Sequence, residues 1–391
     1  MTDVAQRMRA IAPFRVMEIL ARARAMEAAG RDVVHMEIGE PDFVSPQPVI
    51  DAGIASLRAG LTHYTPAAGL PKLREAIAAY YRQRFAVTVD PAHIIITPGS
   101  SGALQLVLGA LVNPGDEVLL TDPGYPCNRH MVSLFGGIPV PMPVAADNGF
   151  TVSPQQLRDA ITERTRALMV ASPANPTGNL IGIQELGRLY GVLRDNKQSV
   201  LICDEIYQGL QYDSTVETAL ALGGDNVVVI NSFSKYFGMT GWRVGWAVVP
   251  GWLIEPMERL AQNIFLAAPT PAQHAAVAAF SPASMEILEA RRYEFQLRRD
   301  FLFDAVNQLG FAMTEKPLGA FYLYADASAF TDDSAGFAEE LLASAGVAVT
   351  PGLDFGSNQP ERHVRFAYTT ALDRLETGME RLRTFLRAGA G

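Results

Sequence analysis

The chain has 391 residues, more than a single hydrophobic core usually supports, so its length predicts two domains. Apolar residues make up 49% and charged residues 19% of the sequence, which is typical of a globular protein. The net charge of −9 and the lack of basic runs argue against a nucleic-acid partner, because such proteins present basic patches.

The termini and the cysteines indicate where the protein works. No apolar run is long enough to span a membrane, so no membrane partner is expected. The arginines of the N-terminus are interrupted by Asp3, Glu18 and Glu27, and no apolar core of a signal peptide follows. Cys127 and Cys203 predict a reducing compartment without disulfides. We therefore expect a cytoplasmic protein, with a transit peptide as the alternative.

The N-terminal part predicts helices over 14–29, 48–59 and 72–85, and a strand over 33–38. The first helix is expected to place three apolar residues on one face: Phe14, Met17 and Leu20. Gly39 follows the strand, and its backbone N–H can lie against a ligand because it has no side chain, although this stretch alone favours a plain turn. Tyr64, in an exposed loop, is either a surface residue or reaches a neighbouring subunit.

A small-residue loop, Pro98–Gly102, is predicted between a strand over 93–97 and a helix over 103–111. Free N–H groups and the helix dipole both favour an anion at a helix N-terminus. Ser100 and Ser101 therefore belong either to a phosphate cradle or to an ordinary loop. The glycine spacing matches neither a dinucleotide-binding fingerprint nor a P-loop.

The middle of the chain alternates between strands and helices. Strands are expected over 117–121, 138–142, 167–171, 200–203, 227–231 and 244–249, and helices over 154–161, 183–194 and 252–265. Near-continuous apolar strands are typical of a mostly parallel sheet covered by helices on both faces. Polar residues follow several strand ends: Tyr125, Asn175, Asp204, Tyr207 and Lys235. Because ligands collect at the carboxyl ends of such strands, we expect one shared site.

Lys235 differs from the other lysines in its surroundings. The sequence has only four lysines against 28 arginines; Lys72, Lys197 and Lys316 lie in polar or turn-like surroundings. Lys235 is flanked by Phe, Tyr, Met and Trp, and Arg243 follows eight positions later. Burial disfavours the charged form of an amine, which lowers its pKa and makes it a nucleophile and base. A lysine whose stem only covers apolar surface is the alternative.

The C-terminal part predicts a second, smaller α/β domain. Pro282 is expected to break the chain before a long bridging helix over 284–309. Three strands and a helix should follow: 321–324, 347–350 and 363–368, with the helix over 335–345. Arg365 interrupts the last strand, and an inward arginine needs a partner, either a carboxylate ligand or a structural salt bridge.

Taken together, these residues resemble the class I/II (fold type I) pyridoxal-phosphate-dependent aminotransferases, and look closest to the aspartate-aminotransferase-like branch. The resemblance rests on Asn175-Pro-Thr-Gly178, Asp204-Glu-Ile-Tyr207, and Ser232-Phe-Ser-Lys235 with Arg243. It covers nearly the whole chain, up to Arg365. It implies an α/β fold with a mostly parallel central sheet covered by helices. The implied division is an N-terminal segment of the small domain (1–47), a large cofactor-binding domain (48–283), and a bridging helix with the C-terminal small domain (284–391).

The resemblance also implies the cofactor, pyridoxal 5′-phosphate, and a role for each polar residue. Lys235 would form a Schiff base with the cofactor aldehyde and then shuttle a proton. Asp204 would pair with the pyridine nitrogen, and Tyr207 and Asn175 with the phenolic oxygen of the ring. Tyr125 would stack on the ring, although a packing tyrosine is the equal alternative. The phosphate would be held by Ser100, Ser101, Ser232, Arg243 and, from the second subunit of a homodimer, Tyr64.

The implied substrates are an amino acid and a 2-oxo acid, which exchange an amino group by a ping-pong mechanism. Arg365, Asn175 and the Gly39 amide would bind the α-carboxylate, for which a planar guanidinium is well suited. For a distal carboxylate, Arg15 is a candidate by position, and a solvated helix residue is the alternative. Apolar and aromatic donors stay open beside aspartate. No metal is expected.

Two other functions stay open at this point. A lyase of the same fold, such as a carbon–sulfur β-lyase or a cyclopropane-forming synthase, would share Lys235, Asp204 and Arg365. A cofactor-binding regulatory domain is the other, but the helical N-terminus leaves no room for a DNA-binding domain and the charge is unsuitable.

Overall fold

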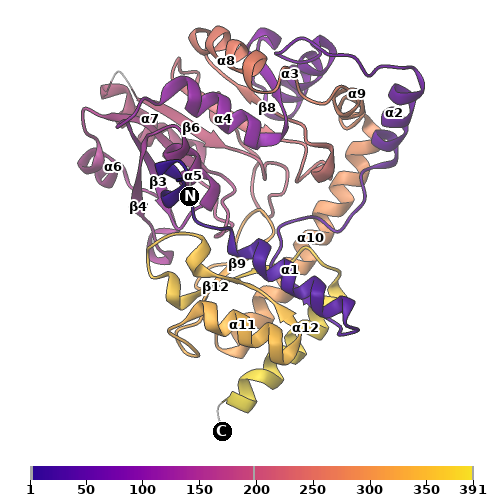
Figure 1. The fold of residues 1–391 in the computed structure, drawn as a ribbon, viewed down its shortest axis with the longest axis vertical. Coiled ribbons are helices and arrows are strands. Elements are labelled where there is room, and N and C mark those ends of the chain that lie inside the picture. The colour runs from indigo at the N-terminus through magenta and orange to yellow at the C-terminus, as the bar shows by residue number, and fades with distance from the viewer. Residues whose placement is uncertain (1–2, 197–198, 390–391) are drawn as a thin grey trace.

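The computed structural model describes residues 3–196 and 199–389, so the predicted surroundings of Lys197 lie outside the described residues. A larger upper part surrounds one long sheet, and a smaller lower part contains the C-terminus (Figure 1). This arrangement confirms the predicted α/β fold with a mostly parallel central sheet. None of the helices described is long and apolar enough to cross a membrane.

Seven strands form the central sheet, in the order β2-β8-β7-β6-β5-β3-β4. Their bounds are β2 Ile94–Thr97, β3 Glu117–Asp122, β4 Ile138–Pro143, β5 Thr165–Ala171, β6 Val200–Asp204, β7 Val227–Ser232 and β8 Gly245–Val248. Only β8 runs antiparallel to its neighbours. Strands such as β6 and β7 are buried along their whole length, because helices cover both faces of the sheet.

The helices of the upper part include two that the sequence patterns did not predict, α5 and α9. The bounds are α2 Gln47–Arg58, α3 Pro71–Phe85, α4 Gly99–Leu111, α5 Pro126–Leu134, α6 Pro154–Ala160, α7 Ile183–Asp195, α8 Gly251–Ile264 and α9 Thr270–Ala278. Helix α4 begins earlier than predicted, so Ser100 and Ser101 lie in its first turn and not in a loop. Small polar residues are tolerated there because the first N–H groups of a helix need no partner within the helix.

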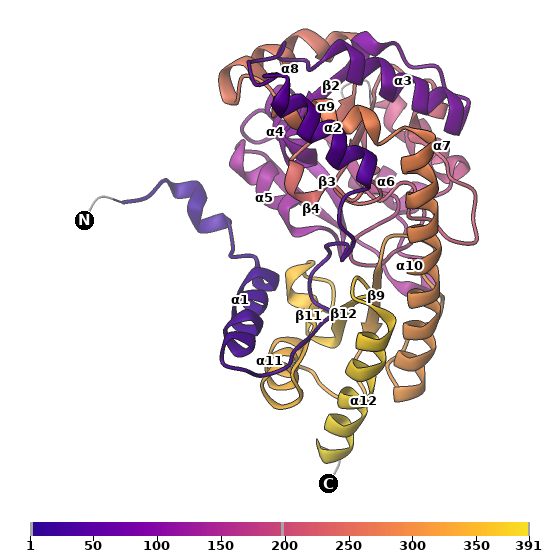
Figure 2. The ribbon, with the colours of Figure 1, turned by 90° about the vertical axis from the view of Figure 1, so that its right-hand side faces the viewer.

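Helix α10 (Pro282–Leu309) runs along one side of the molecule, from the upper to the lower part (Figure 2). The predicted break before this helix is present, since α9 ends at Ala278, but α10 begins two residues earlier than predicted, with Pro282 as its first residue. Proline is well suited to this position, since its missing N–H would have no partner in the helix. Ser281 caps the start by accepting from the Ser284 N–H at 3.3 Å.

The lower part combines an N-terminal segment, from α1 onward, with the C-terminal part of the chain. Its elements are α1 Arg15–Ala28, β1 Val34–His35, β9 Tyr322–Asp326, α11 Ser334–Ala345, β10 Val347–Ala348, β11 Thr350–Pro351, β12 His363–Ala367 and α12 Leu372–Gly389. Strands β11, β12 and β9 form one antiparallel sheet, while β1 pairs in parallel with β10. β1 is shorter than predicted, since residues 36–38 continue toward the pocket described below.

The buried face of α1 differs from the predicted one. Its buried residues are Val16, Ile19, Leu20 and Ala23. Met17 is 52% exposed, so Phe14, Met17 and Leu20 do not form a common core face. The spacing of the two sets fits a helix equally well, and only the packing against the C-terminal segment decides between them.

Candidate active site

The carboxyl ends of the central strands open into a pocket of about 400 Å³ that is also lined by α1 and the lower part. The residues expected to bind the cofactor or the α-carboxylate line it, with one exception: Gly39, Ser100, Ser101, Tyr125, Asn175, Asp204, Tyr207, Ser232, Lys235, Arg243 and Arg365. The parallel strands end at one edge of the sheet, which is why residues so far apart in sequence meet. Tyr64 is the exception; it is 85% exposed and lies outside this pocket.

Lys235 lies on the loop after β7, and its amine faces the pocket. Its Nζ donates a hydrogen bond of 2.7 Å to the Gly39 carbonyl and lies 5.9 Å from the centre of the Phe321 ring. Burial lowers the pKa of Lys235 to about 8, although the nearby Glu40 carboxylate opposes this shift. A substantial fraction of the amine is therefore neutral near physiological pH, as the aromatic flanks of this lysine predict.

Asp204 ends β6 and is 4% exposed. Burial raises its pKa to about 7, while the Ile206 N–H, which donates to Oδ1 at 3.2 Å, and the charge of Lys235 act in the opposite direction. A cation placed beside such a buried carboxyl group stabilises its charged form. Asp204 and Lys235 thus bring two groups with shifted pKa values into one pocket.

Arg365 projects from β12 into the same pocket and is 2% exposed. Its Nη1 donates to Asn175 Oδ1 at 2.8 Å, and its Nη2 donates to the Glu37 carbonyl and, at 3.2 Å, to Thr350 Oγ1. Its Nε is buried without a hydrogen-bond partner among the described residues. The guanidinium lies 4.3 Å above the Tyr322 ring. A buried cation with a free donor is suited to a carboxylate ligand.

A second guanidinium, that of Arg243, lies against the start of α4. Arg243 has a left-handed backbone, φ 54°, and its Nη1 donates to the Thr240 carbonyl at 2.9 Å. A Cβ on Gly99 would come within 2.5 Å of Arg243 Nη2, so only glycine permits this approach. Ser232 and Ser234 line the same pocket with their hydroxyls 2.9 Å apart. Arginine, hydroxyls and helix N–H groups together are a typical phosphate site.

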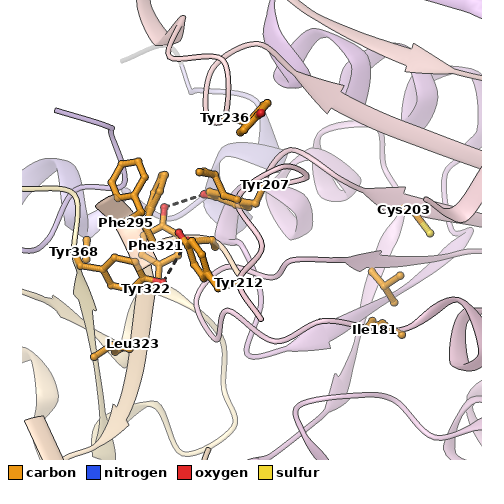
Figure 3. Close-up of a cluster of buried hydrophobic side chains, with 14 of the residues drawn as sticks. Ile181, Cys203, Tyr207, Tyr212, Tyr236, Phe295, Phe321, Tyr322, Leu323 and Tyr368 are labelled. Atoms are coloured by element: carbon orange, nitrogen blue, oxygen red, sulfur yellow. Dashed lines mark hydrogen bonds between the residues drawn. The ribbon is translucent and has the colours of Figure 1, made fainter. Parts of the chain in front are cut away.

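Tyr322 is the main site residue that sequence reasoning missed. Its hydroxyl lies 2.8 Å from that of Tyr207, and both side chains belong to the aromatic cluster in Figure 3. A Cβ on Gly39 would come within 1.7 Å of the Tyr322 hydroxyl. The only sequence signal was its place in a predicted strand, because the pairing of β9 with β12, which brings it beside Arg365, is not visible in the sequence.

A buried polar network supports the Lys235 loop and was also missed. Gln208 Nε2 donates to Glu205 at 2.8 Å, and Gln208 Oε1 accepts from Asn231 Nδ2 at 3.0 Å. Asn231 Oδ1 in turn accepts from the backbone N–H of Ser232 at 2.7 Å. This chain of hydrogen bonds fixes the end of β7 relative to the end of β6.

Gly39 and Arg15 differ in detail from what the sequence suggested. Gly39 contributes its carbonyl to Lys235, whereas the expectation concerned its amide. Arg15 is exposed and does not line the pocket, which fits a solvated helix residue and not a receptor for a distal carboxylate within this chain.

Comparison with known proteins decides the family. The model of the class I and II aminotransferases matches residues 31–382. The chain is 37% identical to a valine–pyruvate aminotransferase of Mycobacterium tuberculosis, over 99% of both proteins. It is 36% identical to an aspartate aminotransferase of Geobacillus stearothermophilus, over 99% of this chain and 100% of the relative. The chain belongs to the class I and II aminotransferases.

Solved structures agree with this membership. An aspartate aminotransferase from Thermus thermophilus with maleate matches 98% of this aminotransferase and 100% of its own chain, with a TM-score of 0.93 and 35% identity. An aminotransferase from Mycobacterium tuberculosis gives 0.95 and 37% identity over 99% and 100% of the two chains. The prediction of a pyridoxal-phosphate-dependent transaminase is therefore confirmed, and the lyase alternative is not favoured.

The residues of this aminotransferase fit pyridoxal phosphate. The Gly99 backbone and Arg243 form a cradle that a single Cβ would fill, as a phosphate site requires. Asp204 offers a buried carboxylate to a cationic ring nitrogen, and Lys235 offers a partly neutral amine to an aldehyde. A separate guanidinium in the same pocket, that of Arg365, has an Nε without a hydrogen-bond partner among the described residues.

Proposed function

We propose that this aminotransferase works through Lys235 and Asp204, with Arg243 binding the cofactor phosphate and Arg365 binding the α-carboxylate of the substrate. The observation that carries this assignment is the convergence of one amine, one buried carboxylate and two separately held guanidiniums on a single pocket. When bound, pyridoxal phosphate supplies the aldehyde that receives the amino group and an electron-withdrawing ring.

The protein's own groups divide the remaining work. Lys235 Nζ, partly neutral because of its lowered pKa, would take the proton from the α-carbon of the substrate and deliver it to the carbon that came from the cofactor aldehyde. With the cofactor bound, Asp204 would keep a proton on the ring nitrogen, while Tyr207 and Asn175 would hold the phenolic oxygen. Tyr125 would stack on the ring. The first-turn N–H groups at Ser100 and Ser101, with Ser232 and Arg243, would bind the phosphate.

We propose further that the amino donor has an uncharged side chain. Apolar residues of α1 and α5 line the pocket: Phe14, Val16, Met17, Cys127 and Met131. Both arginines of the pocket already have a role in the proposed assignment. A second carboxylate would meet no further arginine or free lysine among the described lining residues. The likeness to a valine–pyruvate aminotransferase supports this choice.

A half-reaction screen tests the assignment. Each of the twenty amino acids is added to the cofactor-loaded protein, and conversion of the bound cofactor to its amine form is followed by absorbance. Conversion should persist until a 2-oxo acid is added. Neutral apolar donors should convert fastest. A tenfold preference for aspartate would contradict the proposed donor class, and turnover of a donor without conversion would contradict transamination.

We propose a homodimer in which Tyr64 reaches the phosphate of the neighbouring subunit. The tyrosine is 85% exposed between α2 and α3, although an exposed aromatic ring gains little from water alone. Equal amounts of Lys235→Ala and Tyr64→Ala subunits are refolded together. If Tyr64 acts across the interface, about a quarter of wild-type activity returns, since about half of the dimers are mixed and each has one intact site. No recovery, or a fully active monomer in sedimentation, would contradict the proposal.

We propose the domain division 1–47, 48–283 and 284–391, which the separate sheets and the course of α10 support. The central sheet lies wholly within 48–283. A cytoplasmic location is also proposed, and two unpaired cysteines support it. Cell fractionation tests it, and recovery of the protein from an oxidising compartment would contradict it.

A further inference from the structure

Helix α1 walls the pocket but has no cap of its own. Phe14 occupies its N-cap position and makes no capping hydrogen bond through its side chain. Helix starts usually carry Ser, Thr, Asp or Asn here, because the first N–H groups need acceptors. The Phe14 ring instead turns its edge toward Tyr125, with 6.2 Å between centroids and an interplanar angle of 80°. A residue that lines the pocket therefore occupies the N-cap position of α1.

Asp354 supplies the missing cap from the far end of the chain. One of its carboxylate oxygens accepts from the Arg15 N–H at 3.1 Å and the other from the Val16 N–H at 2.9 Å. Asp354 is only 4% exposed, so water competes little for these hydrogen bonds. Its negative charge also lies at the positive end of the helix dipole.

The backbone around Asp354 ties the same junction to two further walls of the pocket. The Asp354 carbonyl accepts from Arg129 Nη2 on α5 at 2.9 Å. The Phe355 carbonyl accepts from the Gly124 N–H, just before α5, at 2.8 Å. The Phe355 ring centre lies 4.8 Å from the guanidinium carbon of Arg365. Residues 354–355 thus contact α1, the start of α5 and Arg365 at once.

We infer that Asp354 is a positioning residue whose carboxylate holds the first turn of α1 closed over the substrate. This inference deepens the proposed function and rests on it. Without the carboxylate the turn is closed in only a fraction of the molecules, and the apparent affinity for substrate falls by that fraction. Loss of a helix cap changes the ratio of closed to open molecules by roughly 2- to 30-fold, so KM rises by up to that factor while kcat stays nearly constant.

The test compares Asp354→Ala and Asp354→Asn with Asp333→Ala in the cofactor-loaded enzyme. Asp333 caps α11 by accepting from the Gly336 N–H at 3.0 Å and does not line the pocket, so it is the matched control. Two carboxylates that cannot react serve as probes beside the best amino donor of the screen: 3-phenylpropanoate, and acetate, which has no side chain to contact Phe14. Binding is read from the absorbance of the cofactor.

Asp354→Ala is expected to raise KM, and to weaken binding of 3-phenylpropanoate more than binding of acetate. Asp354→Asn, which keeps one accepting oxygen, should fall between Asp354→Ala and wild type. Asp333→Ala should lower the unfolding temperature and leave KM unchanged.

The possible results separate a failure of the inference about Asp354 from a failure of the proposed function. An unchanged KM in Asp354→Ala would overturn the inference, and so would an equal loss for both probes, which points to the electrostatics of Arg365. If Asp354→Ala does not fold, Asp354→Asn decides: a raised KM supports the inference and an unchanged one overturns it. A wild-type enzyme that converts no amino acid would instead contradict the proposed function.

Discussion

Replacement of Arg365 by lysine separates charge from geometry in the proposed carboxylate site. Lysine keeps the positive charge but replaces a planar fork by a compact ammonium on a flexible stem. In the structure the fork reaches Asn175 at 2.8 Å and Thr350 at 3.2 Å, and its Nε has no hydrogen-bond partner in the described part of the chain. A lysine at this position cannot make the two parallel hydrogen bonds that a carboxylate accepts from arginine.

The expected rise in KM follows from the hydrogen bond to the α-carboxylate that a lysine cannot make. A hydrogen bond between charged groups contributes about 1.5–3 kcal/mol, which corresponds to about 10- to 150-fold in affinity. Arg365→Lys should therefore raise KM for the amino donor by about that factor. Since the α-carboxylate is bound equally before and during the reaction, kcat should change much less.

Steady-state kinetics with the best donor measure this effect, and Arg299→Lys is the matched control. Arg299 is also buried, lies 4.8 Å from the Tyr212 ring, and donates to the Pro317 carbonyl at 3.0 Å, but it does not line the pocket. Its replacement should lower stability and leave KM unchanged. If both variants raised KM alike, or if Arg365→Lys left it within twofold of wild type, Arg365 would not be the carboxylate receptor.

Two further predictions concern the amine and the glycine beside it. The rate at which the cofactor-free protein captures pyridoxal phosphate should rise with pH through about 8, because only the neutral amine of Lys235 reacts and burial lowers the pKa of this amine. Stopped-flow absorbance measures the rate of capture. A rate that rises only near the ordinary lysine pKa of 10.5 would refute the prediction. Gly39→Ala should lose most activity, because the added Cβ would lie 1.7 Å from the Tyr322 hydroxyl. Adding Tyr322→Phe to the same chain should restore part of the activity. A double variant without restored activity would show that this clash is not the cause.

The sequence predicted the site well where the chemistry is local. Asp204 and Lys235 follow apolar strands, and parallel strands end at one edge, so their meeting could be expected from the order of elements alone. The aromatic residues around Lys235 likewise indicated a lowered pKa. Ser100 and Ser101 line the pocket although the start of their helix was misplaced, and their role in binding an anion stays a prediction.

What the sequence did not predict depends on pairing between distant segments. Tyr322 reaches the site because β9 pairs with β12, and Asp354 caps α1 across 339 residues. Such contacts leave no periodic pattern in either segment. Which residues of α1 are buried depends on a distant segment in the same way, and Met17, on the apolar face named from the sequence, is 52% exposed.

The central claim is that Lys235 holds the cofactor and transfers the proton. Purified wild-type protein and the Lys235→Ala variant are each mixed with pyridoxal phosphate and desalted. Their absorbance at visible wavelengths is then recorded before and after addition of an amino donor. The control is Lys316→Ala, which removes a partly exposed lysine paired with Asp300. We predict visible absorption and conversion by the donor in the wild type and in Lys316→Ala, and neither in Lys235→Ala. Full transamination by Lys235→Ala would contradict the account.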